Sequence, residues 1–252
     1  MYDLLKVTML GLFFGTFGTT LGGIIGVRFQ NPSNKILSFI LSLAGGLMTS
    51  ILSFDLIPEA LKIASITNVI LGIALGIFCM IVCNYLVDKK FTENSQMLRS
   101  IKEENKKDLL RAGIVTSIGL AIHNFPEGLA IGSGFGASLT LGYSLAIAIC
   151  IHDIPEGISM AVPMKNGGMK KSKVIFYVVL SGVTTGIGAF LGALVGGISQ
   201  SIIAMCLAFA AGAMIYIVSG ELTPEANNLY HGRMTAVGSM LGLLIGIFAM
   251  SI

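Results

Sequence analysis

The chain alternates long apolar runs with short polar breaks, and the length of these runs predicts its elements. A transmembrane helix needs about 20 mainly apolar residues. Division of the sequence at its charged or turn-rich breaks gives eight runs of this kind. The runs are residues 5–27, 36–57, 68–87, 112–133, 142–162, 174–197, 201–222 and 234–252. The pattern therefore predicts an all-α integral membrane protein with eight transmembrane helices.

The composition agrees with the pattern. Of the 252 residues, 54% are hydrophobic and only 12% are charged, and the mean hydropathy is +0.85. This balance excludes a soluble α/β domain. We expect residues 1–252 to form a single transmembrane domain, in which the polar stretch 88–111 is a cytoplasmic linker between the third and fourth helices.

The distribution of Lys and Arg predicts the orientation. Fourteen of the 16 cationic residues fall in breaks that share one side of the membrane, whereas Lys6 and Lys62 fall on the other side. The positive-inside rule then places both termini outside. We expect a multi-pass protein of the cell (inner) membrane, surrounded by the lipid bilayer. Because the cationic residues are explained by this rule, the net charge of +3 gives no reason to expect a nucleic-acid partner.

Two apolar runs share a sequence repeat at a spacing of 166 residues. Residues 44–60 and 210–226 are identical at nine of seventeen positions. In the predicted topology these segments cross the membrane in opposite directions. We therefore expect an inverted repeat of helices 1–3 and 6–8 around a central hairpin of helices 4 and 5. Inverted repeats around a midplane site are typical of secondary transporters that work by alternating access.

A polar signature occurs in both helices of the central hairpin. His123 and Glu127, and likewise His152 and Glu156, are four residues apart and share one helix face. Both pairs lie near the bilayer centre, where a charged side chain costs at least about 2.5 kcal/mol. A bound dication offsets this cost, as would partial protonation or a water-filled cavity. We expect a metal site between the two helices, with hydrogen-bonded clusters that only fix helix packing as the alternative.

The ligand types narrow the choice of ion. Imidazole together with carboxylate suits Zn²⁺, Fe²⁺ or Mn²⁺ better than Cu⁺, Ca²⁺ or Mg²⁺. We expect Zn²⁺ first, with Fe²⁺, Mn²⁺ or Cd²⁺ as competitors, bound as the transported ligand and not as a prosthetic group. Met48 offers a thioether as a further ligand, or it packs in the core.

Further acids mark the ends of the second and seventh runs. Asp55 and Glu59 lie toward the predicted outside, and Glu221 and Glu225 lie toward the predicted inside. We interpret these pairs as staging points at the two mouths of a transport path, or as solvated helix ends.

At its two His-x-x-Pro-Glu-Gly signatures, residues 123–128 and 152–157, the chain resembles the ZIP family of zinc and iron permeases. The similarity is to the bacterial branch with eight helices. It extends over essentially the whole chain and includes Pro-Glu-Ala at 58–60 and 224–226. The resemblance implies uptake of a divalent metal into the cytoplasm and movement of a transport domain against a scaffold domain.

The resemblance also implies ligand roles. Four positions match the family's main transport-site ligands: His123, Glu127, His152 and Glu156. Met48 is at a neighbouring position that contributes in some members. Asn124 and Asp153 match residues that build an adjoining second metal position with the shared glutamates. Many bacterial members supply a carboxylate from helix 6 where this chain has Thr185, and a hydroxyl is a weaker ligand, so the sequence leaves a two-metal centre open.

Other functions remain open from the residues alone. An intramembrane zinc metallohydrolase would use the same ligands to activate water, but the sequence has no His-Glu-x-x-His motif. A metal-selective channel could contain the same site. No phosphate-cradling Gly-x-x-x-x-Gly-Lys motif is present, so ATP is not expected to be the direct energy source. We therefore expect a secondary transporter and not an enzyme. Glycine stripes in the apolar runs suit either internal packing or the seam of a homodimer.

Overall fold

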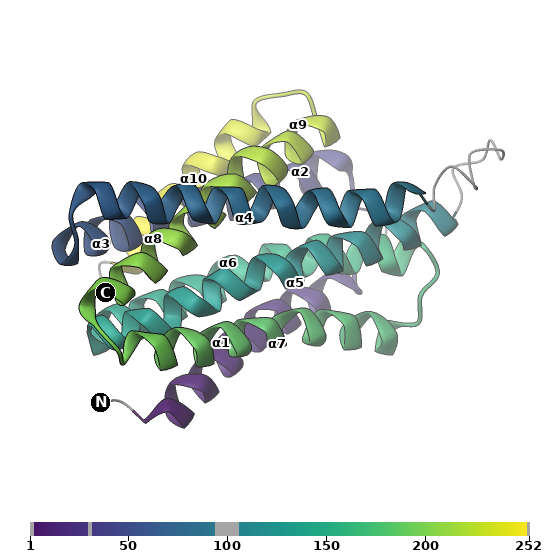
Figure 1. The fold of residues 1–252 in the computed structure, drawn as a ribbon. Coiled ribbons are helices and arrows are strands. Elements are labelled where there is room, and N and C mark those ends of the chain that lie inside the picture. The colour runs from purple at the N-terminus through teal and green to yellow at the C-terminus, as the bar shows by residue number, and fades with distance from the viewer. Residues whose placement is uncertain (1–2, 30–31, 94–105, 251–252) are drawn as a thin grey trace.

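The computed structural model describes residues 3–29, 32–93 and 106–250, and its regular elements there are all helices (Figure 1). They form an elongated bundle, with both chain ends at the same end of the molecule. The α-helices are α1 (Leu4–Gly26), α2 (Asn34–Ser50), α3 (Ile57–Ile63), α4 (Ile66–Glu93), α5 (Lys106–Ala137), α6 (Leu139–Asn166), α7 (Lys171–Gly196), α8 (Gln200–Ile217), α9 (Thr223–Leu229) and α10 (Met234–Met250). Two π-helical segments are η1 (Ile51–Leu56) and η3 (Val218–Leu222).

The predicted all-α membrane architecture is confirmed. Within the described residues, seven helical segments are long and apolar enough to cross a membrane, and α10 is a shorter apolar helix of 17 residues. That length is at the lower limit for a crossing, at about 1.5 Å per residue. With α10 included, each predicted run matches one helical segment.

Two predicted helix ends were wrong. The runs 36–57 and 201–222 continue through α3 to Ile63 and through α9 to Leu229. Both predicted ends were placed just before a proline, Pro58 or Pro224. In the structure each proline lies in the first turn of the following short helix, where its missing N–H has no intrahelical partner to lose.

The polar stretch 88–111 is helical at both ends. The helix α4 continues to Glu93, and α5 begins at Lys106. Residues 94–105 lie outside the described residues. The cytoplasmic position of this linker therefore stays a prediction.

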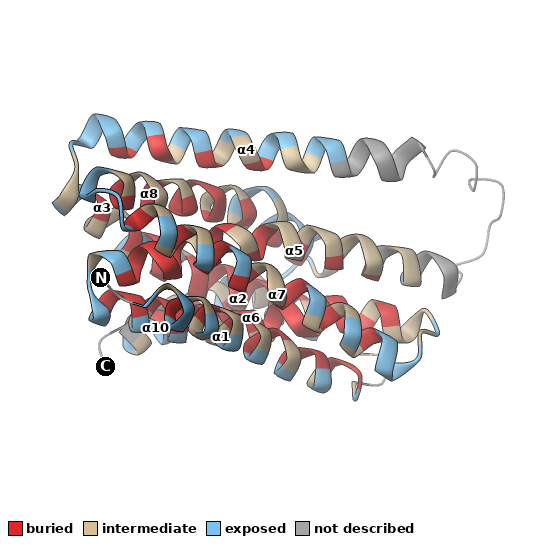
Figure 2. Cartoon of the chain, turned by 60° about the horizontal axis from the view of Figure 1, so that its bottom comes forward, coloured by how far each residue is buried: buried red, intermediate tan, exposed pale blue. Residues whose placement is uncertain are grey.

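The helices pack as two groups. In the first group, α1, α5, α6 and α7 contact one another extensively; in the second, α2 packs on α10 and α4 packs on α8. Figure 2 shows burial concentrated inside the bundle and exposure along much of α4. In the apolar 18-residue stretch of α6, 78% of the residues are buried inside the bundle, compared with 22% in that of α4. The helix α6 is therefore central, and its polar residues His152, Asp153 and Glu156 are shielded from lipid.

Glycine permits the closest approach in the first group. A Cβ atom at Gly22 of α1 would lie 2.1 Å from the carbonyl oxygen of Ile154 in α6, and one at Gly157 would lie 2.2 Å from the carbonyl oxygen of Thr19. No larger residue fits without separation of the helices. The glycine stripe of α1 therefore serves internal packing, and a homodimer stays a prediction.

The two segments of the sequence repeat divide at equivalent residues to within one position. Residues 34–63 form α2, η1 and α3, and residues 200–229 form α8, η3 and α9. Their packing partners are also equivalent, because a Cβ atom at Gly46 would lie 2.1 Å from the carbonyl oxygen of Ser239, and one at Gly212 would lie 2.1 Å from that of Ile73. Each residue of one pair is 166 positions from a residue of the other. An internal two-fold relation would produce this pattern, and the complete inverted-repeat layout stays a prediction.

Candidate metal site

Four side chains from two neighbouring helices meet inside the bundle. They are Glu127 of α5 and His152, Asp153 and Glu156 of α6, and one ligand atom from each lies within 4.8 Å of the others. All four residues are buried, with a relative exposure of 0%. Ligand atoms around one tetrahedral Zn²⁺ ion are about 3.3 Å apart, so small side-chain movements would suffice for a shared ion.

Helix geometry explains why three of the four side chains come from α6. His152, Asp153 and Glu156 occupy one broad face because positions i, i+1 and i+4 lie on the same side of a helix. The helix α6 continues through Pro155, as α5 does through Pro126. Behind the cluster, a Cβ atom at Gly18 of α1 would lie 2.8 Å from Cβ of Asp153. Close packing of α1 therefore leaves these side chains little room to turn away.

The imidazole of His152 is oriented by the backbone of its own helix. Its Nδ1 atom lies 3.3 Å from the carbonyl oxygen of Ala148, and its Nε2 atom lies 3.1 Å from Oε1 of Glu127. When Nδ1 donates its hydrogen to Ala148, Nε2 carries a lone pair directed at a carboxylate oxygen of Glu127. Two acceptors at this distance need a cation or a proton between them, and a hydrogen bond from the second nitrogen is the usual support of a metal-binding histidine.

The carboxylates of the cluster have unpaired oxygens. Within the described part of the chain, no hydrogen-bond donor reaches Oε2 of Glu127 or either oxygen of Asp153 and Glu156. Nε2 of His152 lies 3.4 Å from Oδ1 of Asp153. Buried carboxylates without partners are costly, and a bound dication is an efficient compensation. The donor set of one imidazole and three carboxylates fits a first-row dication.

His123 contacts a different acid. Its Nε2 atom lies 3.1 Å from Oε2 of Glu221 in η3, and Oε1 of Glu221 accepts a hydrogen bond from Nδ2 of Asn84 in α4. A cavity of about 280 Å³ opens beside these groups, and Glu225 also lines it. The structure thus separates His123 from the four clustered side chains and places it in the lining of this cavity.

Asn124 and Thr185 are fully buried. Asn124 lies three residues before Glu127 on α5, and Thr185 of α7 packs against α1. The amide Nδ2 of Asn124 lies 3.1 Å from the carbonyl oxygen of Ser181 in α7, whereas its Oδ1 has no hydrogen-bond partner among the described residues. Thr185 is one turn further along α7, and its hydroxyl also has none in that part of the chain. A Cβ atom at Gly15 would lie 2.6 Å from that hydroxyl oxygen. Both oxygens are therefore available as neutral ligands.

Met48 lies in the apolar core. It is fully buried, and it belongs to the same hydrophobic cluster as Met214, its equivalent in the sequence repeat. This position agrees with packing and leaves a thioether ligand as a proposal.

The acids near the other end of the bundle border a separate groove. A cavity of about 660 Å³ is lined by Asp55, Glu59 and Lys62 together with residues of α6 and α10. The hydroxyl of Ser144 in α6 donates to Oδ2 of Asp55 at 3.2 Å. Glu59 forms an exposed ion pair with Lys62 at 2.9 Å. Asp55 therefore connects the two helix groups, whereas Glu59 is engaged on its own short helix.

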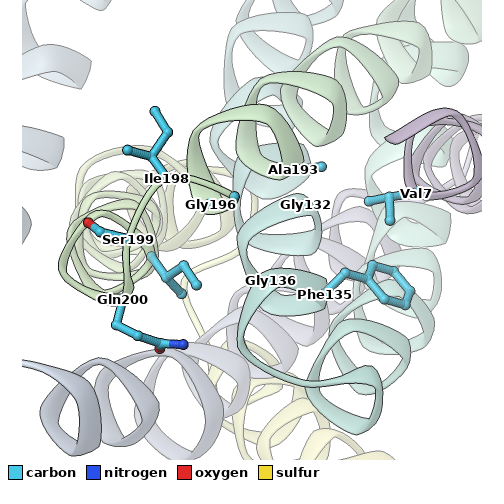
Figure 3. A pocket seen from close by; sticks show the side chains of 11 residues that line it. Val7, Gly132, Phe135, Gly136, Ala193, Gly196, Ile198, Ser199 and Gln200 are labelled. Carbon is cyan, nitrogen blue, oxygen red and sulfur yellow. The ribbon is translucent and has the colours of Figure 1, made fainter. Parts of the chain in front are cut away.

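A third cavity carries no charged side chain. It has a volume of about 400 Å³ and lies between α1, α5, α7 and the start of α8 (Figure 3). Its lining combines the apolar side chains Val7, Phe135 and Ile203 with Ser199 and Gln200. No described residue of this lining is a strong ligand for a dication, so the cavity is not part of the candidate metal site.

Asn84 and Ser144 were not predicted as functional residues. Each is a polar residue inside an apolar run, at 68–87 and 142–162, and this was the only signal in the sequence. Small polar side chains are frequent in transmembrane helices. Only the contacts with Glu221 and Asp55 distinguish these two from the rest.

Comparisons with known proteins identify the family of the chain. The family model described as ZIP Zinc transporter matches residues 87–252. The zinc transporter ZupT of Akkermansia muciniphila is 33% identical over 266 residues, which cover 96% of this chain and 93% of that protein. ZupT of Escherichia fergusonii is 31% identical over 232 residues, covering 90% and 89%. ZupT of Escherichia coli O127:H6 is 32% identical over 237 residues, covering 92% and 91%.

Proposed function

The chain belongs to the ZIP family of zinc transporters, and from this premise we propose that it moves Zn²⁺ through a site built from Glu127, His152 and Glu156. It is a multi-pass membrane protein that takes up divalent metal ions. Proteins of this family are transporters and not enzymes, so the metallohydrolase alternative is dropped. The observation that supports the site most strongly is the buried group of four side chains with unpaired carboxylate oxygens.

We propose Zn²⁺ as the main transported ion. The similar curated proteins are zinc transporters by name, and one imidazole with several carboxylates suits a zinc ion. Fe²⁺, Mn²⁺ and Cd²⁺ accept the same donor types and should compete with it. Competition for radiozinc uptake by each of these ions in excess would rank them.

His152, Glu127 and Glu156 would supply the main ligands, Asp153 would complete the coordination, and His123 would bind the ion only during its passage toward Glu221. His123 precedes Glu127 by one helical turn, so a change of side-chain rotamer could exchange Glu221 for the metal. Met48 is the weakest member of the proposed set, because it is packed in the apolar core.

An adjoining second metal position would use Asn124 and Asp153 with the shared glutamates. The unpaired Oδ1 atom of Asn124 and the unpaired oxygens of Asp153 support it, and Thr185 would add a hydroxyl. Because Thr185 is neutral, this position should bind a dication more weakly than the main site. Calorimetric titration of the purified protein with Zn²⁺ would give the number of ions.

The transport path would run from the groove at Asp55 and Glu59 to the cavity at Glu221 and Glu225. Two side-chain contacts connect the helix groups along it: Ser144 with Asp55, and His123 with Glu221. We propose that the groups move against each other by alternating access without ATP, so that the cluster faces one cavity at a time. Saturation of flux at low zinc concentration would distinguish this carrier from a channel.

The orientation is also a proposal. Both chain ends lie at one end of the bundle, and most cationic residues fall in the breaks assigned to the opposite end. The positive-inside rule then puts both termini outside an inner membrane and the Glu221 cavity on the cytoplasmic side.

The decisive experiment is radiozinc uptake into proteoliposomes containing the wild type, Glu127→Ala or Glu156→Ala. We expect both variants to lose at least about 90% of the uptake rate, because each loses a charged ligand that neutral groups replace poorly. Asn68→Ala serves as the control, since Asn68 is on the exposed surface of α4 and lines none of the three cavities. Unchanged uptake in both alanine variants would remove the proposed site.

A further inference from the structure

Glu221 uses both of its carboxylate oxygens to connect helices from the two groups. Oε1 accepts a hydrogen bond from Nδ2 of Asn84 in α4, and Oε2 lies 3.1 Å from Nε2 of His123 in α5. Asn84 is half-buried and lines the same cavity of about 280 Å³ as the other two residues. The three side chains therefore form a continuous chain from α4 through η3 to α5.

We propose that Asn84 is a positioning residue for metal release, which acts by holding the carboxylate of Glu221 toward His123. This inference depends on the proposed function, because it concerns the passage of the metal from the buried cluster to the cavity. Asn84 touches neither the cluster nor the reacting ligands within it. By holding Oε1 of Glu221, it determines the direction in which Oε2 of Glu221 points.

The need for a positioning group follows from the location of Glu221. Its side chain is 28% exposed to the cavity, and η3, which carries it, is a π-helix between α8 and α9. A glutamate with this access to a cavity has several low-energy rotamers. A hydrogen bond from a neighbouring helix selects the rotamer in which Oε2 faces His123.

An amide suits this task for a chemical reason. Its NH₂ group is a donor that holds an ionised carboxylate, and it adds no charge of its own. A lysine at this position would repel the arriving dication, and an aspartate would bind it as a third acid beside Glu221 and Glu225. Asn84 therefore orients Glu221 without repelling the ion or adding a further acid that binds it.

The test is a double-mutant cycle measured as radiozinc uptake in proteoliposomes, with Asn84→Ala, Glu221→Gln and the double variant. Wild-type uptake establishes the transport function independently of Asn84. We expect Asn84→Ala to lower Vmax about tenfold, because a hydrogen bond to a charged group is lost, and to leave KM nearly unchanged. In the Glu221→Gln background the same change should have little further effect, since its target is already altered.

Asn84→Asp separates positioning from simple packing. Aspartate has the shape of asparagine but replaces the donor by an acceptor, so we expect a Vmax at least as low as that of Asn84→Ala. Asn68 is on the exposed surface of the same helix, and Asn68→Ala and Asn68→Asp are the matched controls. Normal transport by Asn84→Asp, or additive effects in the cycle, would overturn the proposal while the proposed function stands. Absence of zinc uptake by the wild type would instead remove the proposed function.

Discussion

His152 of α6 and Glu127 of α5 face each other across the helix interface, with Nε2 and Oε1 3.1 Å apart and both side chains fully buried. The two residues come from separate copies of the same sequence signature. Their contact unites the copies into one potential ligand set, and Asp153 and Glu156 surround it.

His152→Gln should weaken zinc binding and lower zinc uptake. Glutamine occupies a similar volume but has no imidazole nitrogen for a metal, so we expect the affinity for Zn²⁺ to fall by more than about tenfold. Calorimetry in detergent would measure binding, and proteoliposome flux would measure uptake. Wild-type affinity in this variant would show that the imidazole is not a ligand.

His123→Gln should separate binding from transport. Because His123 contacts Glu221 and is not one of the four clustered side chains, we expect zinc affinity to stay within about threefold of wild type while Vmax falls at least about tenfold. The same two measurements apply. An equal loss of affinity in His123→Gln and His152→Gln would instead place both imidazoles on the bound ion.

Asp55 and Glu59 should differ in their effect on uptake. Asp55 is bonded to Ser144 of the other helix group, whereas Glu59 pairs with the exposed Lys62. We expect Asp55→Asn to raise KM for zinc by about fivefold or more, because the uncompensated acid of the groove attracts the cation. Glu59→Gln should stay within about twofold of the wild type. Identical kinetics for the two variants would contradict a special role of Asp55.

Gly22→Ala should destabilise the packing of α1 on α6. The added methyl group would lie 2.1 Å from the carbonyl oxygen of Ile154, and overpacking of this kind costs about 1–3 kcal/mol. We expect a lower melting temperature of the detergent-solubilised protein and reduced uptake. Gly119→Ala is the matched control for the melting temperature, since a Cβ atom there meets nothing within 4 Å. A normal melting temperature for Gly22→Ala would mean that the two helices can separate freely.

Much of the candidate site was predictable from residue spacing. His152 and Glu156 are four residues apart, and a helix places them on one face whatever else the chain does. The contact of His123 with Glu221 was not predictable in this way, because 98 residues separate the two positions. Neither local period nor composition encodes how far α5 is rotated toward η3.

The π-helical segments show the same limit. The sequence repeat and its two prolines marked residues 44–60 and 210–226 as related segments, but the predicted spans ended before the prolines. In the structure, η1 and η3 carry Asp55 and Glu221 just before those prolines. The widened turns and the continuation into α3 and α9 depend on packing against other helices, which no local pattern records.

The sequence by itself determined the class of the protein, its membrane-crossing segments and the types of its candidate ligands. These properties are local, because an apolar run of sufficient length must bury its backbone polar groups in a helix within the bilayer. Tertiary structure alone decided which of those ligands meet. Backbone contacts at residues such as Gly22, Gly46 and Gly157 set the rotation and separation of the helices, and these determine that Glu127 joins His152 while His123 joins Glu221.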